Sequence, residues 1–260
     1  SLGAALTELS LRGALSVANN ESLDSDNLTL RLHSGGSITG TGRLDVGGTN
    51  LELQDRLTVS GTLALDNDTT LLLNGNPLDL SGGTLEPHGG TIDLANFVTD
   101  NATGLQLEGD TEISSTSPFT FGTLELNGHI LTLGGSGGLT LPNPLAMNVA
   151  EARIATGNAD LTLDSPLQLD VGAITSTGGT LKFADGVALG STGALDVSGS
   201  TLEVSQTLNL GGGTFSSDDG SVLNLLDDTV LSSNNPLAFQ SVDLNSNALS
   251  LGTATTHLSL

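Results

Sequence analysis

The stretch from Gly122 to Leu141, GTLELNGHILTLGGSGGLTL, decides the fold of this chain. It contains three apolar–polar–apolar triplets, Leu124–Leu126, Leu131–Leu133 and Leu139–Leu141, separated by turn-forming residues. Ordinary sandwich strands usually run about five or six residues, so these short triplets indicate another kind of all-β protein. Because side chains alternate along a strand, each triplet points its apolar residues inward and its middle residue outward.

The triplet recurs along the whole chain, about 33 to 35 times in 260 residues, with Gly-Gly, Asn-Gly and Ser-Gly turns between copies. No segment shows a sustained helical period of apolar residues. The pattern predicts an all-β parallel β-helix, or β-solenoid, in which each strand pairs with its equivalent one coil away. We expect about 11 to 12 coils of roughly 22 to 24 residues, with three short strands per coil.

A longer repeat overlies the triplets. Residues 97–134 align without a gap on residues 215–252, at an offset of 118, with 15 identities in 38 positions. Further matches upstream extend the repeat, so that 61–134 matches 179–252. We therefore predict a single continuous β-solenoid over residues 1–260 that contains a tandem duplication of about 118 residues, or close to five coils.

Phenylalanines and prolines add to this prediction. Phe121 matches Phe239 in the duplication, and Phe97 matches Phe215, so we expect both pairs to be core residues at matching corners. Five prolines each precede a triplet, where a missing N–H costs no ladder hydrogen bond. They are Pro77, Pro118, Pro144, Pro166 and Pro236.

Composition excludes several classes of protein. Six basic residues face 29 acidic ones, which gives a formal charge of −23, and such a field repels nucleic acid and anionic membrane surfaces. The chain has no cysteine, so it can form neither a disulfide nor a thiolate metal site. No apolar run approaches the roughly 20 residues that span a bilayer. The first residues lack the basic and apolar regions of a signal peptide, which is therefore either absent or already removed.

Strings such as GTLELNGHILTLGG, LDLSGGTLE and TGALDVSGSTLEV run through nearly the whole chain. They resemble the β-solenoid passengers of bacterial autotransporters and the stalks of filamentous-haemagglutinin-like adhesins. The resemblance implies a right-handed parallel β-helix that is secreted and displayed at the cell surface. It also implies contact with host cells, neighbouring cells or glycans.

Candidate catalytic residues do not stand out. Polysaccharide lyases and hydrolases with a parallel β-helix need Asp or Glu clustered with a basic residue on one face. In this sequence Arg43, Arg56, Arg153 and Lys182 are scattered singly. The histidines His33, His88, His129 and His257 are also isolated, and we expect them on solvated turns rather than at zinc or catalytic sites. We therefore predict no catalytic, cofactor-binding or metal-binding residue.

Three further patterns in the sequence each have an ordinary explanation. Asp24-Ser25-Asp26 and Asp66-Asn67-Asp68 place carboxylates two residues apart and could bind calcium, but Asp and Asn are also common turn formers. The four N-glycosylation sequons, at Asn20, Asn27, Asn67 and Asn101, are as many as chance supplies. Outward threonines alternate with other polar residues, unlike the regular ladders of ice-binding solenoids.

These observations favour a non-enzymatic extracellular structural protein, either a stalk segment of an adhesin or a subunit of a surface filament. The alternatives are a carbohydrate-active β-helix enzyme and a carbohydrate- or ligand-binding module. The triplet rhythm is present at residues 6–11 and at 257–260. We therefore expect the ends to meet adjoining coils or other copies of the chain, head to tail.

Overall fold

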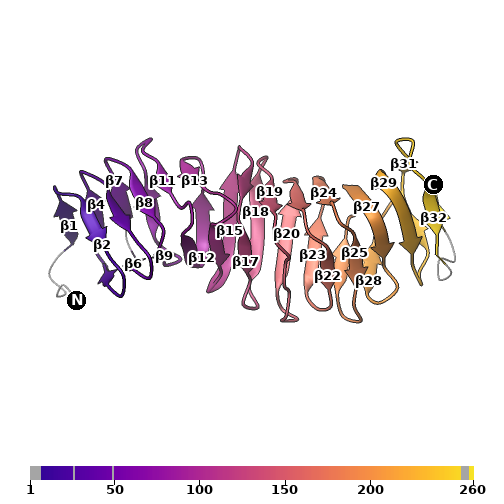
Figure 1. Cartoon of the computed structure of the whole chain (residues 1–260), viewed down its shortest axis with the longest axis horizontal. Coiled ribbons are helices and arrows are strands. Elements are labelled where there is room, and N and C mark those ends of the chain that lie inside the picture. Colours follow the sequence, from indigo (N-terminus) through magenta and orange to yellow (C-terminus); the bar gives the residue numbers. More distant parts are fainter. Residues whose placement is uncertain (1–6, 26, 49, 253–257) are drawn as a thin grey trace. The chain divides into compact units, whose positions relative to one another are not determined.

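The structure is a computed structural model that describes residues 7–25, 27–48, 50–252 and 258–260. The described residues form strands and turns, with no helix. They belong to two compact units: unit 1, with Ser1–Ile113 and Thr120–Thr123, and unit 2, with Ser114–Phe119 and Leu124–Leu260. Both units are stacks of parallel strands (Figure 1), and together they hold about 12 turns of a β-solenoid, as the triplets predict.

Three parallel sheets build unit 1, and consecutive strands of the chain enter them in turn, which gives three strands per coil. The first sheet contains β1 (Glu8–Leu11), β4 (Thr29–Leu32), β7 (Asn50–Leu53) and β10 (Thr70–Leu72). The second contains β2 (Leu15–Val17), β5 (Gly36–Ile38), β8 (Leu57–Val59), β11 (Leu78–Asp79) and β13 (Phe97–Val98). The third contains β3 (Ser22–Asp24), β6 (Arg43–Val46), β9 (Thr62–Leu65), β12 (Thr84–Asp93) and β14 (Gly104–Gln106).

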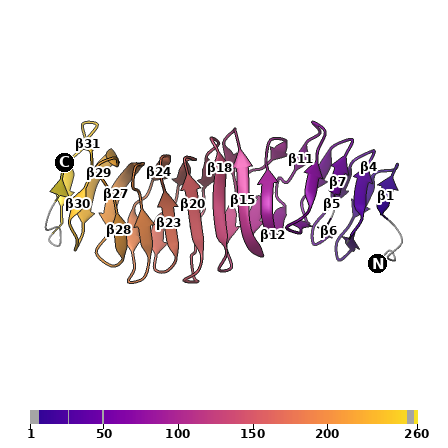
Figure 2. The same cartoon turned by 180° about the vertical axis from the view of Figure 1, so that it is seen from behind.

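Unit 2 repeats this arrangement (Figure 2), with two of its strand stacks joined by long strands that belong to both. One sheet contains β18 (Ile130–Gly135), β20 (Arg153–Gly157), β23 (Ala173–Ser176), β26 (Ala194–Asp196) and β28 (Thr214–Ser216). The joined stacks contain β19 (Leu139–Leu141), β21 (Leu161–Leu163), β22 (Leu167–Leu169), β24 (Thr180–Phe183), β25 (Val187–Leu189), β27 (Thr201–Asn209), β29 (Val222–Ser232), β31 (Ser241–Asp243) and β32 (Leu249–Leu251). The remaining strands are β15 (Gly109–Ser115), β16 (Phe119–Thr120), β17 (Thr123–Glu125), β30 (Leu237–Ala238) and β33 (Leu258–Ser259).

The pairing register gives the length of each coil. Paired residues lie between 19 positions apart, as for Arg43 and Thr62, and 23 positions apart, as for Ile130 and Arg153. Most paired strands lie 19 to 21 positions apart, as for Leu161 and Leu181 or Leu30 and Leu51, so the expected coil length of 22 to 24 residues is wrong for most coils. The difference lies in the turns, because paired triplets keep apolar residue on apolar residue.

The predicted inward and outward directions of the triplet side chains are confirmed in the stretch from Gly122 to Leu141. Leu124 is 7% exposed, Leu126 2% and Leu131 0%, whereas Glu125 is exposed. Columns of one residue type run through the interior of unit 2, as with Leu161, Leu181, Leu202 and Leu223, all of them fully buried. Burying one such side chain contributes about 2 kcal/mol, so these columns supply most of the driving force for stacking coils.

Three strands are much longer than a triplet, because they turn a corner of the coil without leaving the sheet. β12 has 10 residues, β27 has 9 and β29 has 11. In β12 the corner falls at Gly89 and Gly90, which have φ of 114° and 84°. In β27 it falls at Gln206, with φ of 63°, next to a register shift. Such bulged corners replace the turn motifs that the sequence pattern predicts at every corner.

The predictions for phenylalanine and proline are partly wrong. Phe121 and Phe239 are buried as expected, but Phe97 and Phe215 are only half-buried and lie within β13 and β28. Four of the five prolines directly precede a strand, whereas no strand follows Pro144. Leu145 and Met147, which follow Pro144, are buried although they lie outside any strand.

The first sheet of unit 1 ends at β10, inside the unit. β10 pairs with β7, and in the described part of unit 1 no strand pairs with its other edge. A cavity of about 200 Å³ lies there, between residues 65–71 and 89–93. No helix among the described residues is long and apolar enough to cross a membrane.

Candidate functional site

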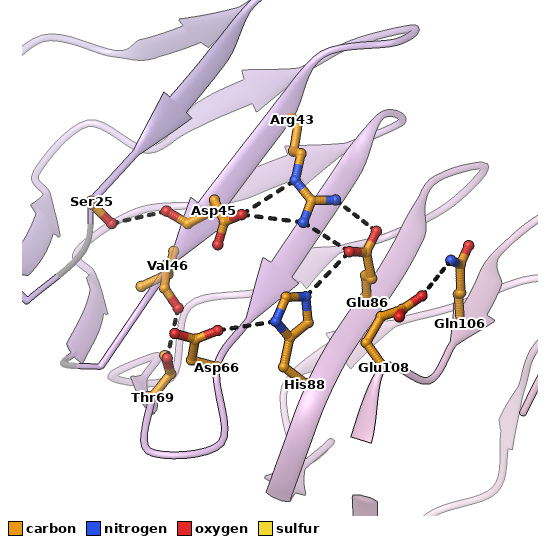
Figure 3. Close-up of polar contacts among 10 residues, drawn as sticks. All are labelled: Ser25, Arg43, Asp45, Val46, Asp66, Thr69, Glu86, His88, Gln106 and Glu108. Carbon is orange, nitrogen blue, oxygen red and sulfur yellow. Dashed lines mark hydrogen bonds and ion pairs between the residues drawn. The ribbon is translucent and has the colours of Figure 1, made fainter. Parts of the chain in front are cut away.

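A cluster of charged side chains lies on the outer face of the third sheet of unit 1 (Figure 3). We call it the charged cluster. It consists of Arg43, Asp45, Asp66, Glu86 and His88. Arg43 and Asp45 lie on β6, Asp66 directly follows β9, and Glu86 and His88 lie on β12, so the cluster joins three consecutive coils.

Arg43 spans one whole coil to reach Glu86. The register places Ala64 of β9 between Asp45 and Glu86, and alanine is too short to block the guanidinium. Arg43 Nη1 donates to one carboxylate oxygen of Glu86 at 2.6 Å and Nη2 to the other at 2.8 Å, while Nη2 also donates to Asp45 at 3.1 Å. Ala64 is fully buried although it holds the outward position of its triplet. The small side chain of Ala64 therefore leaves room for the bidentate ion pair between Arg43 and Glu86.

The interaction between Arg43 and Glu86 keeps both groups ionised. Hydrogen bonds from Arg43 lower the pKa of Glu86, outweighing the opposite effect of its partial burial. The hydrogen bond to Glu86 raises the pKa of Arg43 further above its ordinary value, again against the effect of burial. Both groups stay ionised at neutral pH, which suits an ion pair and not a proton transfer.

His88 lies between two carboxylates from different coils. Its Nδ1 is 3.1 Å from Asp66 Oδ1, and its Nε2 is 3.3 Å from Glu86 Oε1. The expectation of a solvated, isolated histidine is wrong here, because His88 lies on β12 and its side chain is 36% exposed. The outward pairs Arg43-x-Asp45 and Glu86-x-His88 are a signal in the sequence that could have indicated the cluster.

Two other arginines of unit 1 also link coils. Arg31 on β4 donates to Glu8 on β1 and to Glu52 on β7, at 2.7 Å each, and its hydrogen bond lowers the pKa of Glu52. Arg56 pairs with Asp79, whose side chain is 8% exposed. Burial opposes ionisation of Asp79, but hydrogen bonds from Arg56 and Ser81 outweigh it, and the net pKa of Asp79 is lowered.

Polar corners hold the coils together in both units. In unit 1 the buried Thr103 hydroxyl contacts the Leu80 carbonyl one coil earlier, at 3.0 Å, and the Asp100 carboxylate, at 2.9 Å. In unit 2, Ser221 makes the corresponding contacts with Val197, at 3.0 Å, and with Asp218, at 2.8 Å. Thr103 and Ser221 are matched positions of the tandem duplication, as are Asp100 and Asp218.

These corner hydrogen bonds also set the ionisation of the two aspartates. Burial opposes the ionisation of Asp100, but hydrogen bonds from Thr103 and neighbouring amides outweigh it and lower its pKa. The pKa of Asp218 is lowered chiefly by the Gly199 amide and then by Ser221. The Asp-x-x-Thr/Ser sequence is therefore a structural corner, in which a carboxylate caps amides and a hydroxyl reaches the next coil.

The candidate calcium ligands fall at such corners too. Thr69 Oγ1 donates to the Val46 carbonyl at 2.7 Å, and Asp66 contacts His88, so the Asp66–Thr69 segment is another structural corner. Asp26 of the other candidate pair lies outside the described residues, as does His257. Within the described ranges, no three His, Cys, Asp or Glu side chains are grouped so that they could hold a metal ion.

Of the other histidines, His33 is exposed and its Nε2 lies 2.9 Å from Ser10 Oγ. His129 follows the turn at Asn127–Gly128. All four sequon asparagines are exposed. None of these residues belongs to the charged cluster.

Comparison of the chain with protein-family models, with curated proteins and with solved structures gave no match. The geometry described above therefore carries the functional argument.

Proposed function

We propose that this chain is a non-enzymatic structural protein displayed outside the cell, as a stalk segment of an adhesin or as a subunit of a surface filament. The observation that carries the proposal is the coil-on-coil register. Within each unit, successive coils are joined by parallel backbone pairing and by continuous apolar columns. Such a stack extends in one direction by adding layers, which suits a spacer that holds other parts at a distance.

The use of ionisable groups supports the same proposal. Arg31, Arg43 and Arg56 each bind carboxylates; Arg31 joins its own coil to the coils on both sides, and Arg43 reaches across one coil to Glu86. The carboxylates with a resolved shift, namely Glu52, Asp79, Glu86, Asp100 and Asp218, all have a lowered pKa. A general acid needs a raised pKa, so these groups are set for holding coils together.

One observation favours the alternative of a carbohydrate-active enzyme. The charged cluster brings acids, an arginine and a histidine to one face, which is the kind of grouping that a β-helix lyase or hydrolase uses. We favour the structural role because Arg43 and Glu86 already satisfy each other in a bidentate pair. A substrate would have to break that pair before either group could act.

Three experiments test the proposal. Labelling of intact cells with an antibody against the chain should give a surface signal. Electron microscopy of the purified chain over a range of concentrations should show particles that stay single, as for a stalk segment, or that join end to end, as for a filament subunit. In parallel, wild type and Arg43→Gln would be assayed on a panel of acidic and neutral polysaccharides, with Arg31→Gln as the matched control. Cleavage that is lost in Arg43→Gln and retained in Arg31→Gln would replace the structural role with the enzymatic one.

A further inference from the structure

His88 lies between the carboxylates of Asp66 and Glu86. Its ring can donate a hydrogen bond to both of them only when it is charged. Asp66 and His88 are neighbours across the sheet, since Leu65 pairs with Pro87. The Asp66 carboxylate faces Nδ1 at 3.1 Å, and the Glu86 carboxylate, two residues back on the same strand, faces Nε2 at 3.3 Å. Carboxylate oxygens accept hydrogen bonds and do not donate them when ionised.

A neutral imidazole has one N–H and one bare nitrogen, so it can satisfy one of these contacts. The other contact would then place a nitrogen lone pair against a negatively charged oxygen. An imidazolium carries a proton on both nitrogens and can donate to both carboxylates at once. We propose that His88 is a proton-operated clamp, which joins two coils of unit 1 more strongly in mildly acidic solution than above neutral pH.

The charges around His88 fit this role. Asp66 approaches from the turn after β9, and Glu86 lies on β12. The Glu108 amide donates to the Pro87 carbonyl at 2.9 Å, so the following coil contributes a third acidic residue to this part of the sheet, and the Glu108 carboxylate accepts a hydrogen bond from Gln106 at 2.8 Å. Arg43 is the cation of the charged cluster, and it is already shared by Asp45 and Glu86. Protonation of His88 adds a second cation to an acidic surface.

Acidification has opposite effects on the His88 contacts and on the arginine–carboxylate pairs. Acidification weakens an Arg–carboxylate pair once the carboxylate is protonated, which happens below about pH 4. The His88 contacts instead strengthen when the imidazole gains its proton, because only the charged ring donates to both carboxylates. The window for a test therefore lies above the pH at which the carboxylates themselves titrate.

The test compares the full chain with His88→Gln, whose amide keeps hydrogen-bonding capacity but takes up no proton in this range. Hydrogen exchange of the Asp66 and Glu108 amides, corrected for intrinsic exchange rates, reports local opening at the two coils. Between pH 7.5 and 5.5, the protection of these amides should rise about three- to tenfold more in wild type than in His88→Gln. His33→Gln is the matched control, because the contact of His33 is with the neutral Ser10 hydroxyl.

A second readout uses the wild-type chain alone. Nitrogen NMR shifts of the imidazole distinguish a ring with two N–H groups from a neutral one, and at pH 5.5 His88 should show two. A neutral ring at that pH would overturn the proposal. Equal changes in amide protection for wild type and His88→Gln would overturn it as well.

Discussion

The turns at Asn127–Gly128 and Asn245–Ser246 offer a test in which one substitution should have opposite effects at two places. Both turns have positive φ at both central residues: 50° and 88° in the first, 48° and 70° in the second. This is the pattern of a type I′ turn. The two turns match each other in the tandem duplication, so unit 2 contains a glycine and a serine version of one turn. We expect Ser246→Gly to stabilise unit 2.

The magnitude follows from the backbone. The left-handed region is unfavourable by about 1 to 2 kcal/mol for a residue with a Cβ, whereas glycine has no such penalty there. Part of that gain is offset, because glycine loses more conformational entropy on folding, by about 0.5 to 1 kcal/mol. The expected net gain for Ser246→Gly is about 0.5 to 1 kcal/mol. The reverse change, Gly128→Ser, should cost more, since its Cβ would lie 3.3 Å from Val149 Cγ1.

Denaturant unfolding and amide exchange in unit 2 would measure both variants. Ser250→Gly is the control, because Ser250 is exposed on strand β32 and is not among the residues with positive φ. There the same substitution should destabilise by roughly 0.5 to 1 kcal/mol. Loss of stability in Ser246→Gly, or no effect of Gly128→Ser, would show that the left-handed turn does not control stability at these positions.

Four further predictions concern the core, the corners, the charged cluster and metal binding. Leu126→Asp should cost several kcal/mol, about 3 or more, because it buries an unpaired charge, whereas Glu125→Gln should be nearly neutral; equal melting temperatures would contradict the inside–outside assignment. Asp218 has a lowered pKa, so its stabilisation is present above the unfolded value of about 3.9 and disappears as pH falls through the folded value; the melting temperature of Asp218→Asn should therefore lie below that of wild type at pH 7, and the difference should shrink as the pH is lowered below the unfolded value. Arg43→Lys should cost about 1 kcal/mol in urea unfolding, because one ammonium cannot replace the bidentate pair, and an unchanged midpoint would remove Arg43 from the coil contacts. A chelator should leave the melting temperature unchanged, and a clear decrease that Asp66→Asn abolishes would establish a calcium site.

The fold class could be predicted from the sequence because the triplet is a local rule that repeats. Leu124, Leu126 and Leu131 are buried and Glu125 is exposed, as a period of two requires. In a parallel stack, each strand meets a copy of itself one coil away, so a local pattern suffices to define the long-range pairing. The turn residues Asn127 and Gly128 could be recognised for the same reason, since their backbone preference is local.

The long strands and the end of the first sheet at β10 could not be predicted, because they depend on how a coil closes. β12 passes its corner at Gly89 and Gly90 without leaving the sheet, although a Gly-Gly pair in the sequence indicates an ordinary turn. Whether β10 finds a partner depends on the relative lengths of two successive coils. Successive coils come into register with one another only in the folded solenoid, so the pattern within one coil does not predict this pairing.

In the charged cluster, too, the direction of each side chain could be predicted from the sequence, whereas its partner could not. That Arg43, Glu86 and His88 point outward follows from their places beside buried residues on alternating strands. That Arg43 binds Glu86, 43 residues away, depends on a coil-to-coil register of 19 residues followed by one of 22, and on Ala64 between them. The sequence alone determined which faces are apolar and which are polar, since side-chain direction in a strand is a local property. Tertiary structure decided which polar groups meet, because uneven turns set the register, and a shift of one residue would separate every pair in the cluster.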